Sequence, residues 1–263
     1  MYKRSNLLQL LFDEYNIENL SFGVKQDKLG DVMEEYCTRL LNWPYLFRKL
    51  KMRNFDLTNT DEYLYWHLIS KLGIDIDNVV SMSATRDIKH RYTGGNAKTD
   101  VLLTVTYPTS EIKIPISVKQ TTKPKVAMAE FDAETIFREV GITDEIVQYL
   151  ILKHQTDASA INFTKEEKTQ LKERLAPYAR PFVRWVLTGT PVPTDDLRFP
   201  KIMLKFDMSI DDQIKNIHIY DIEDYVDSVM CDKKGNVKSG GFGTGLGWTY
   251  ATGSKGKKIQ FKG

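Results

Sequence analysis

The chain has 263 residues, of which 41% are apolar, so it can bury a substantial core as one large domain or two small lobes. No apolar run approaches the roughly 20 residues that span a bilayer, and the first residues lack a signal-peptide h-region. We therefore expect a soluble, cytoplasmic protein. Two cysteines, Cys37 and Cys231, exclude a disulfide framework and a zinc site. The formal net charge of +2 indicates no partner, although residues 233–263 carry seven lysines and no acid.

The first third of the chain is predicted to be helical. Apolar residues recur every three to four positions in residues 6–15, 27–43 and 60–74. The middle of the chain changes period: residues 101–107 read as a largely apolar strand, and in residues 112–119 apolar positions alternate with lysine, proline and serine. This pattern predicts a half-buried hairpin.

Further elements follow toward the C-terminus. Helical patterns return at 132–142, 144–155 and 164–187, and a Pro- and Asp-rich connector follows at 188–200. Two strands are then predicted at 201–208 and 214–222. A short helix at 223–231 and a basic strand or arm at 252–263 complete the chain. We expect an α/β fold with a central mixed sheet flanked by helices. Because the connector could hinge two lobes, we divide the chain into 1–190 and 191–263.

The hairpin brings opposite charges toward one end. Ser117 and Lys119 project from the same face, and Asp100 begins the neighbouring strand. A carboxylate beside a lysine suits Mg²⁺-dependent phosphodiester hydrolysis, because the acid holds a hard cation and the ammonium places or activates water. On spacing alone a simpler interpretation is favoured, in which Asp100 opens a strand after a turn at Gly94 and Gly95, and Lys119 is an exposed strand residue.

The wider sequence favours the catalytic interpretation. The motifs that decide are "GGNAKTD", "AEFDAETI", "GITDE", "KHQTDAS", "FVRW" and, most specific, the tail "GFGTGLGWTYATGSKGKKIQFKG". In these motifs, and almost end to end, the chain resembles the MspI-type restriction endonucleases of the PD-(D/E)xK nuclease superfamily. The resemblance implies a restriction-endonuclease-like fold and a type II enzyme that cuts double-stranded DNA with Mg²⁺. It also implies the site CCGG, cut as C^CGG to leave 5′-phosphates, and a companion DNA methyltransferase as a genetic rather than a bound partner.

The family's catalytic residues are carried over by these motifs. Asp100 corresponds to the metal-binding aspartate and Lys119 to the lysine. Ser117 departs from the pattern, since most of the superfamily has Asp or Glu at this position and MspI-like chains have Asn. A serine hydroxyl can orient a metal-bound water but contributes no charge.

An acid on a covering helix could compensate for Ser117. The apolar stripe of residues 27–43 comprises Leu29, Val32, Met33, Tyr36, Cys37 and Leu40. At about 100° per residue, Glu34 lies on the border of this stripe and Glu35 points nearly away from it. Glu34 is therefore our second candidate metal ligand, although a solvated helix acid is an equal alternative.

The basic tail is predicted to contact DNA. Lys255, Lys257, Lys258 and Lys262 can neutralise phosphates, and Thr249, Thr252, Ser254 and Gln260 can donate to or accept from base edges or backbone oxygens. By resemblance, Gln260 and Lys262 read bases in the major groove. The loop at 120–130 is the second predicted contact region, with Lys123 and Lys125 on phosphates and with Ala127 in place of a family serine.

Other features leave alternatives open. Residues 240–247 lack the Lys-Ser/Thr ending of a P-loop, so we expect a flexible loop that presents the tail and not a nucleotide site. Arg86, Lys89, His90 and Arg91 either contact phosphate or form a solvated loop. Two other functions also remain: a DNA-binding module with a degenerate site at Ser117, and a repair nuclease that nicks one strand.

Overall fold

A computed structural model describes residues 5–91 and 96–263. The turn expected at Gly94 and Gly95 lies outside the described residues. The chain divides into two compact units, unit 1 (Met1–Pro124 with Asp196–Asp221) and unit 2 (Lys125–Asp195 with Ile222–Gly263). Our boundary between residues 190 and 191 lies near the crossing from Asp195 to Asp196, and the assignment of domains on either side of it stays a prediction.

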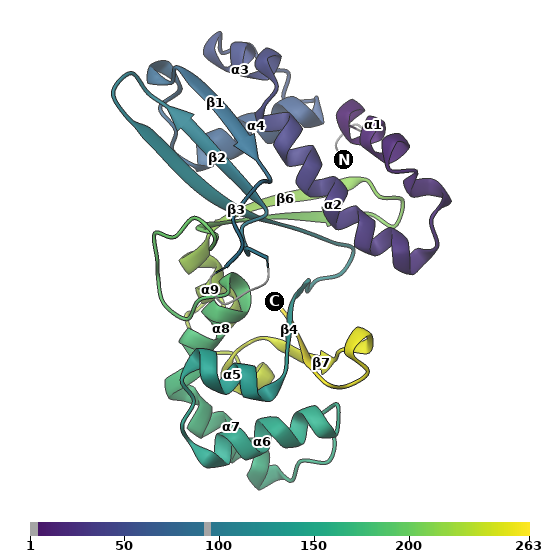
Figure 1. Ribbon diagram of the computed structural model, residues 1–263, viewed down its shortest axis with the longest axis vertical. Helices are drawn as coiled ribbons and strands as arrows, with labels where there is room; N and C mark the ends of the chain where they lie inside the picture. The colour runs from purple at the N-terminus through teal and green to yellow at the C-terminus, as the bar shows by residue number, and fades with distance from the viewer. Residues whose placement is uncertain (1–4, 92–95) are drawn as a thin grey trace. The chain divides into compact units, whose positions relative to one another are not determined.

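Unit 1 is built on a five-stranded sheet with the order β1-β2-β3-β5-β6 (Figure 1). The strands are β1 (Ser81–Thr85), β2 (Val101–Thr106), β3 (Glu111–Thr121), β5 (Ile202–Met208) and β6 (Ile214–Asp221). β3 and β5 are parallel and every other neighbouring pair is antiparallel, which confirms the mixed sheet. β1 was not predicted, because its sequence "SMSAT" offers no alternation of large apolar residues.

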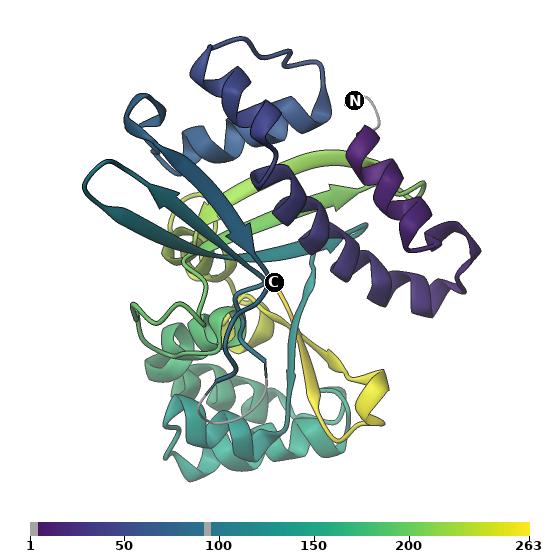
Figure 2. The ribbon, with the colours of Figure 1, turned by 45° about the horizontal axis from the view of Figure 1, so that its top comes forward.

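Helices cover this sheet. They are α1 (Asn6–Glu14), α2 (Phe22–Leu41), α3 (Pro44–Lys51) and α4 (Thr60–Lys71), with short 3-10 turns at Ile17–Asn19 and Ile76–Asn78. α2 packs across β1, β2 and β3, as both ribbon views show (Figures 1 and 2). All six residues of the predicted α2 stripe, including Val32 and Tyr36, are at most 2% exposed, so the orientation of this helix is confirmed.

Unit 2 combines five helices with a small sheet of order β4-β8-β7. The helices are α5 (Ala133–Val140), α6 (Glu145–Thr156), α7 (Lys165–Leu175), α8 (Ala179–Thr188) and α9 (Ile222–Met230). The strands are β4 (Ala127–Phe131), β7 (Gly247–Tyr250) and β8 (Ile259–Lys262). The 3-10 turns are η3 (Ala176–Tyr178), η4 (Gly240–Gly243) and η5 (Thr252–Ser254). The single helix predicted at 164–187 is wrong. It breaks at η3, because Pro177 has no N–H to donate within a helix and clashes with the preceding turn.

One face of the small sheet forms the aromatic core of unit 2. The Phe131 ring stacks on Trp185 of α8 with centroids 3.9 Å apart, and Phe261 packs edge-on against Phe182 and Trp248, each at 5.2 Å. Aromatic pairs at these separations add to the apolar area that they bury. The alternation along β8 then turns Gln260 and Lys262 to the opposite face. None of the helices in the described part of the chain is long and apolar enough to cross a membrane.

Candidate active site

A polar pocket of about 620 Å³ lies in unit 1 beside the start of β2. Its lining includes Asp31, Glu34, Glu35, Arg86, His90, Thr99 and Asp100. Acids of α2 and the aspartate that precedes β2 therefore share one cavity. The sequence placed two of these acids, Glu34 and Asp100, at one site.

Asp100 is held by three donors on one oxygen. Its Oδ2 accepts hydrogen bonds from Ser117 Oγ at 2.9 Å, from the Val118 N–H at 2.7 Å and from Lys119 Nζ at 3.0 Å. The register of the hairpin explains this cluster, since the Asp100 N–H donates to the Ile116 carbonyl and places the aspartate opposite the next residues of β3. The three side chains predicted to meet at this end of the hairpin do meet.

Ser117 and Lys119 differ in solvent exposure and in the hydrogen bonds that they can still form with another ligand. Ser117 is 1% exposed and donates its hydroxyl proton to Asp100, so only the lone pairs of its oxygen remain for another ligand. Lys119 Nζ donates to Asp100 and to the Val118 carbonyl, at 3.0 Å in both cases, and its side chain remains 22% exposed. The ammonium is therefore fixed in position while still open to solvent.

Arg86 joins two acids of α2. Its guanidinium lies 2.7 Å from the Glu34 carboxylate and 3.4 Å from that of Glu35. Glu35, which we expected to point away from the apolar stripe of α2, also lines the pocket: its side chain is 22% exposed, and Arg86 and Arg39 both contact it. Arg86, which directly follows β1, is thus paired with carboxylates while its side chain stays 30% exposed.

Burial and charge act on Glu34 in the same direction. Desolvation raises the pKa of the Glu34 carboxyl, the nearby charge of Asp100 raises it further, and Arg86 opposes both effects. Two carboxylates that disfavour each other's ionisation leave negative charge that a cation would stabilise. Thr99 adds a buried hydroxyl to the same pocket, and its Oγ1 has no hydrogen-bond partner among the described residues.

Lys98 is a titratable residue that the sequence did not single out. Burial, followed by the charges of Lys119 and Arg91, lowers the pKa of Lys98 to about 8, while Asp100 opposes the shift. The sequence feature that could have drawn attention to Lys98 is its position in the "GGNAKTD" motif. Burial of its side chain could not be predicted from one sequence, because it depends on segments far away in the chain.

Unit 2 carries the predicted base-reading residues on the open face of its sheet. Register places Gln260 between Thr249 and Glu130, and the Gln260 amide donates to Glu130 at 2.8 Å. Lys262 lies between Ala127 and Gly247 and is partly exposed. The segment 120–130 is not one loop as we expected. Its ends belong to β3 and β4, because β4 pairs with β8.

The remaining predicted DNA contacts are mostly exposed. Lys255, Lys257 and Lys258 follow η5 with exposed side chains, Thr252 is exposed, and Ser254 donates to the Ala251 carbonyl at 3.1 Å. Lys123 is exposed in unit 1. Lys125, in unit 2, is exposed as a residue but donates its ammonium to the Gly245 carbonyl at 2.7 Å, and burial lowers the pKa of that ammonium.

No group of three or more His, Cys, Asp or Glu residues is arranged to hold a metal ion within residues 5–91 and 96–263. Of the acids that line the pocket, Asp100 and Glu34 are the predicted ligands, and hydroxyls lie nearby. These are hard oxygen donors, the type preferred by Mg²⁺, which usually keeps several waters and uses one or two carboxylates. The donor set therefore fits a partly hydrated divalent cation.

Comparison with known proteins identifies the family of this chain. A family model described as restriction endonuclease MspI matches residues 9–263. The type II restriction enzyme MspI of Moraxella sp is 35% identical over 266 residues, which cover 99% of this chain and 100% of that protein. The type II restriction enzyme BsuFI of Bacillus subtilis is 23% identical over 255 residues, which cover 94% of this chain and 61% of that protein.

The fold agrees as well. The crystal structure of restriction endonuclease MspI in complex with its cognate DNA matches with a TM-score of 0.86 at 35% identity, over 99% of this chain and 100% of that one. The expected restriction-endonuclease-like architecture, a mixed central sheet flanked by helices, is confirmed. The chain belongs to the MspI family of type II restriction endonucleases and is a site-specific deoxyribonuclease.

Proposed function

We propose that the enzyme binds double-stranded DNA at CCGG and hydrolyses one phosphodiester bond in each strand as C^CGG, leaving 5′-phosphates, with Mg²⁺ as cofactor. The observation that carries this proposal is the contact of Lys119 Nζ with Asp100 Oδ2 at 3.0 Å, beside a second carboxylate. The cognate-DNA complex of MspI supports a duplex as the partner. We infer a cytoplasmic location and a separate companion methyltransferase from the same family membership.

Asp100 and Glu34 would hold the cation. When bound, Mg²⁺ would stabilise charge on the phosphate and make a coordinated water more acidic. Lys119 keeps its ammonium at the Asp100 carboxylate, where its charge can stabilise the negative charge that develops on the scissile phosphate. Ser117 restrains Asp100 through its hydroxyl, a task that needs no charge at this position.

The open face of β4-β8-β7 would read the bases. Glu130 fixes the Gln260 amide through the bond at 2.8 Å, so the side chain enters the groove with little rotamer freedom left to lose. Lys262 would accompany it, with Thr249 and Thr252 nearby. Lys255, Lys257, Lys258, Ser254 and, from unit 1, Lys123 would contact phosphates, while Ala127 could contribute only its backbone.

The test is cleavage of a plasmid of known sequence with and without Mg²⁺, followed by mapping of the ends. We expect discrete fragments that require Mg²⁺ and end at C^CGG with 5′-phosphates. Fragments with other ends would contradict the proposed site. Open circles alone would favour the nicking nuclease, and intact plasmid with specific retention of CCGG duplexes would favour the non-cutting binding module.

A further inference from the structure

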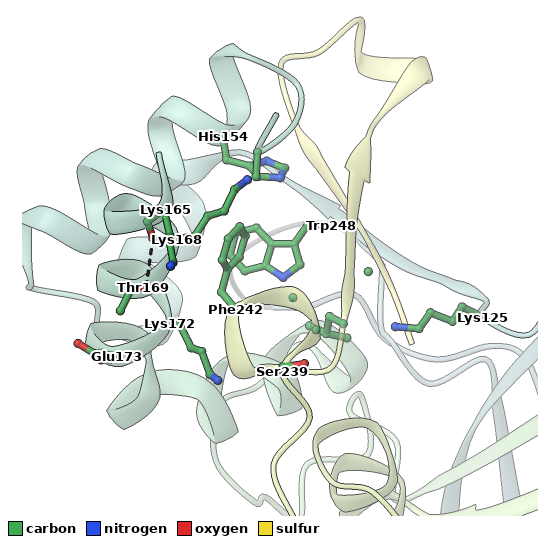
Figure 3. Close-up of a pocket in the computed structure, with 15 residues that line it drawn as sticks. Lys125, His154, Lys165, Lys168, Thr169, Lys172, Glu173, Ser239, Phe242 and Trp248 are labelled. Atoms are coloured by element: carbon green, nitrogen blue, oxygen red, sulfur yellow. Dashed lines mark hydrogen bonds between the residues drawn. The ribbon is translucent and has the colours of Figure 1, made fainter. Parts of the chain in front are cut away.

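A second cavity, of about 770 Å³, lies entirely in unit 2 between α7 and the glycine-rich turn η4 (Figure 3). We call it the lysine pocket. Its charged lining consists of Lys125, Lys165, Lys168, Lys172 and one acid, Glu173. Lys165, Lys168 and Lys172 lie three and four residues apart on one face of α7, and none of them forms an ion pair with another described residue. The pocket therefore holds uncompensated positive charge.

Aromatic rings separate the lysines of α7 from Lys125. Figure 3 shows Phe242 and Trp248 at the centre of the pocket, with Lys165, Lys168 and Lys172 on one side and Lys125 on the other. The Phe242 and Trp248 rings meet edge to face at 5.2 Å. Both residues line the cavity and are partly exposed, and aromatic side chains placed in this way can contact a planar base.

His154 supplies an unmet polar group at the same cavity. The residue is 2% exposed, its ring lies 5.4 Å from that of Trp248, and its Nδ1 has no hydrogen-bond partner among the described residues. A buried ring nitrogen without a partner costs free energy that a bound polar group would recover. The lysines and this nitrogen are independent indications of a ligand.

The η4 turn is held in an unusual conformation that presents Phe242. Phe242 has φ 57°, and its neighbours Gly241 and Gly243 have φ 56° and 87°. A Cβ at Gly241 would lie 2.1 Å from the Leu246 carbonyl oxygen, so only glycine fits there. An aromatic residue at positive φ is strained, and the turn keeps this strain while directing Phe242 toward Trp248.

The lysine pocket lies on the other side of the small sheet from the proposed base-reading residues. Trp248 pairs with Phe261 and Thr249 with Gln260, and neighbouring residues of a strand point to opposite faces. A group bound against Trp248 is therefore not part of the duplex segment that Thr249 and Gln260 would read.

We propose that the lysine pocket binds a nucleotide, with the α7 ammonium groups on its phosphate and Phe242 and Trp248 against its base. The phosphate can belong to a nucleic acid strand or to a free nucleotide, since both offer the same chemistry. The proposal differs from our expectation, based on the missing P-loop pattern, that there is no nucleotide site here, because the proposed phosphate contacts come from lysines of α7 and not from the glycine-rich turn. The proposal is independent of the proposed function, in which Lys168, Lys172 and His154 have no role.

The experiment follows the indole N–H resonance of Trp248 by NMR, assigned from its loss in Trp248→Phe. The probes are inorganic phosphate, dCMP and a mixed-sequence single-stranded octanucleotide, each added to the full-length enzyme up to about 5 mM, the range of weak anion sites. The variants are Lys168→Ala/Lys172→Ala and His154→Gln. The matched control is Lys233→Ala/Lys234→Ala, which removes the same charge from exposed positions of unit 2.

We expect dCMP and the octanucleotide to shift the Trp248 resonance. Binding should weaken about tenfold or more in Lys168→Ala/Lys172→Ala, since each lysine loses a charge-assisted contact, and less than about twofold in the control. His154→Gln should weaken binding to an intermediate degree. Tighter binding of the octanucleotide than of dCMP assigns the site to a strand, and equal binding assigns it to a free nucleotide.

Three results would overturn the proposal. The first is an unchanged Trp248 resonance with every probe. The second is equal binding by Lys168→Ala/Lys172→Ala and the wild type. The third is inorganic phosphate binding as tightly as dCMP, because the aromatic rings would then contribute nothing to binding. Retained cleavage activity in the double variant shows that it is folded.

Discussion

The two functional regions of this enzyme are assembled in different ways. The catalytic cluster is local, because Asp100, Ser117 and Lys119 lie on two strands of one hairpin and meet through its register. The base-reading sheet is non-local, because β4 at Ala127–Phe131 pairs with β8 at Ile259–Lys262. The first region depends on a few side chains at fixed spacing. The second depends on a long-range pairing that positions ordinary polar residues.

The largest effect should follow from substitutions in the catalytic cluster. Lys119→Ala or Asp100→Ala should lower cleavage about a thousandfold or more, because the charge that faces the phosphate, or the carboxylate that would hold the cation, is lost. Single-turnover cleavage of a cognate duplex measures the effect. Lys113→Ala is the matched control, since Lys113 lies on the same strand and is ion-paired only to Glu111 in the described structure, at 3.3 Å. Cutting at wild-type rate by either active-site variant would remove that residue from the mechanism.

The next largest effect should follow from substitutions in the base-reading sheet and in the basic segment before β8. Gln260→Ala should cost on the order of 1 to 3 kcal/mol of binding on the cognate duplex and much less on scrambled DNA, because a base-edge contact is lost. Lys257→Ala should instead reduce the salt slope of binding by about one unit with little change in sequence preference. Titrations of both duplexes across a salt series separate the two outcomes. Equal losses on both duplexes for Gln260→Ala would leave the sheet with a backbone-binding role only.

Substitution of Ser117 tests whether cleavage tolerates the loss of one hydrogen bond to Asp100. Ser117→Ala removes one of three hydrogen bonds to Asp100 Oδ2 and should lower cleavage by about tenfold or more, since a hydrogen bond to a charged carboxylate contributes roughly 1.5 to 3 kcal/mol. Ser117→Asn, which restores the residue typical of the family, should preserve activity. Both are measured as cleavage rates over a range of Mg²⁺ concentrations. Unchanged rate and Mg²⁺ dependence in Ser117→Ala would show that Val118 and Lys119 hold Asp100 without it.

The smallest effect concerns acid stability in unit 2. Burial lowers the pKa of His154, so the folded protein binds this proton more weakly than the unfolded chain does. The stability that follows is complete above the unfolded pKa, about 6.5, and is lost as the pH falls below it toward the folded pKa. Between pH 7.5 and 5.5, wild type should lose more unfolding free energy than His154→Gln in urea unfolding without phosphate. Equal losses would contradict a buried neutral imidazole.

The same contrast explains what one sequence could predict. Period-two alternation predicted β2 and β3 and the meeting of Asp100 with Lys119, and helical spacing predicted the buried stripe of α2 and the position of Glu34. Both patterns are local consequences of backbone geometry. The motifs of the tail identified the family, although they did not reveal which residues pair with it.

The features that escaped prediction depend on contacts across long stretches of chain. β4 and β7 became strands only by pairing with β8, and their own sequences are too short to show alternation. Arg86, which follows β1, contacts both Glu34 and Glu35 of α2. The burial of His154 could not be predicted because it depends in part on aromatic residues nearly ninety or more positions later, among them Phe242 and Trp248. Side-chain burial and strand pairing of this kind are set by tertiary packing.

The central claim is that catalysis and base reading reside in separate sets of residues. The most direct test is the ratio of binding constants for a CCGG duplex and a duplex with one base pair changed, measured for Lys119→Ala and for Gln260→Ala. We predict that Lys119→Ala keeps the wild-type ratio within about twofold, while Gln260→Ala lowers the ratio about tenfold or more. Loss of discrimination in Lys119→Ala, or full discrimination in Gln260→Ala, would contradict the separation.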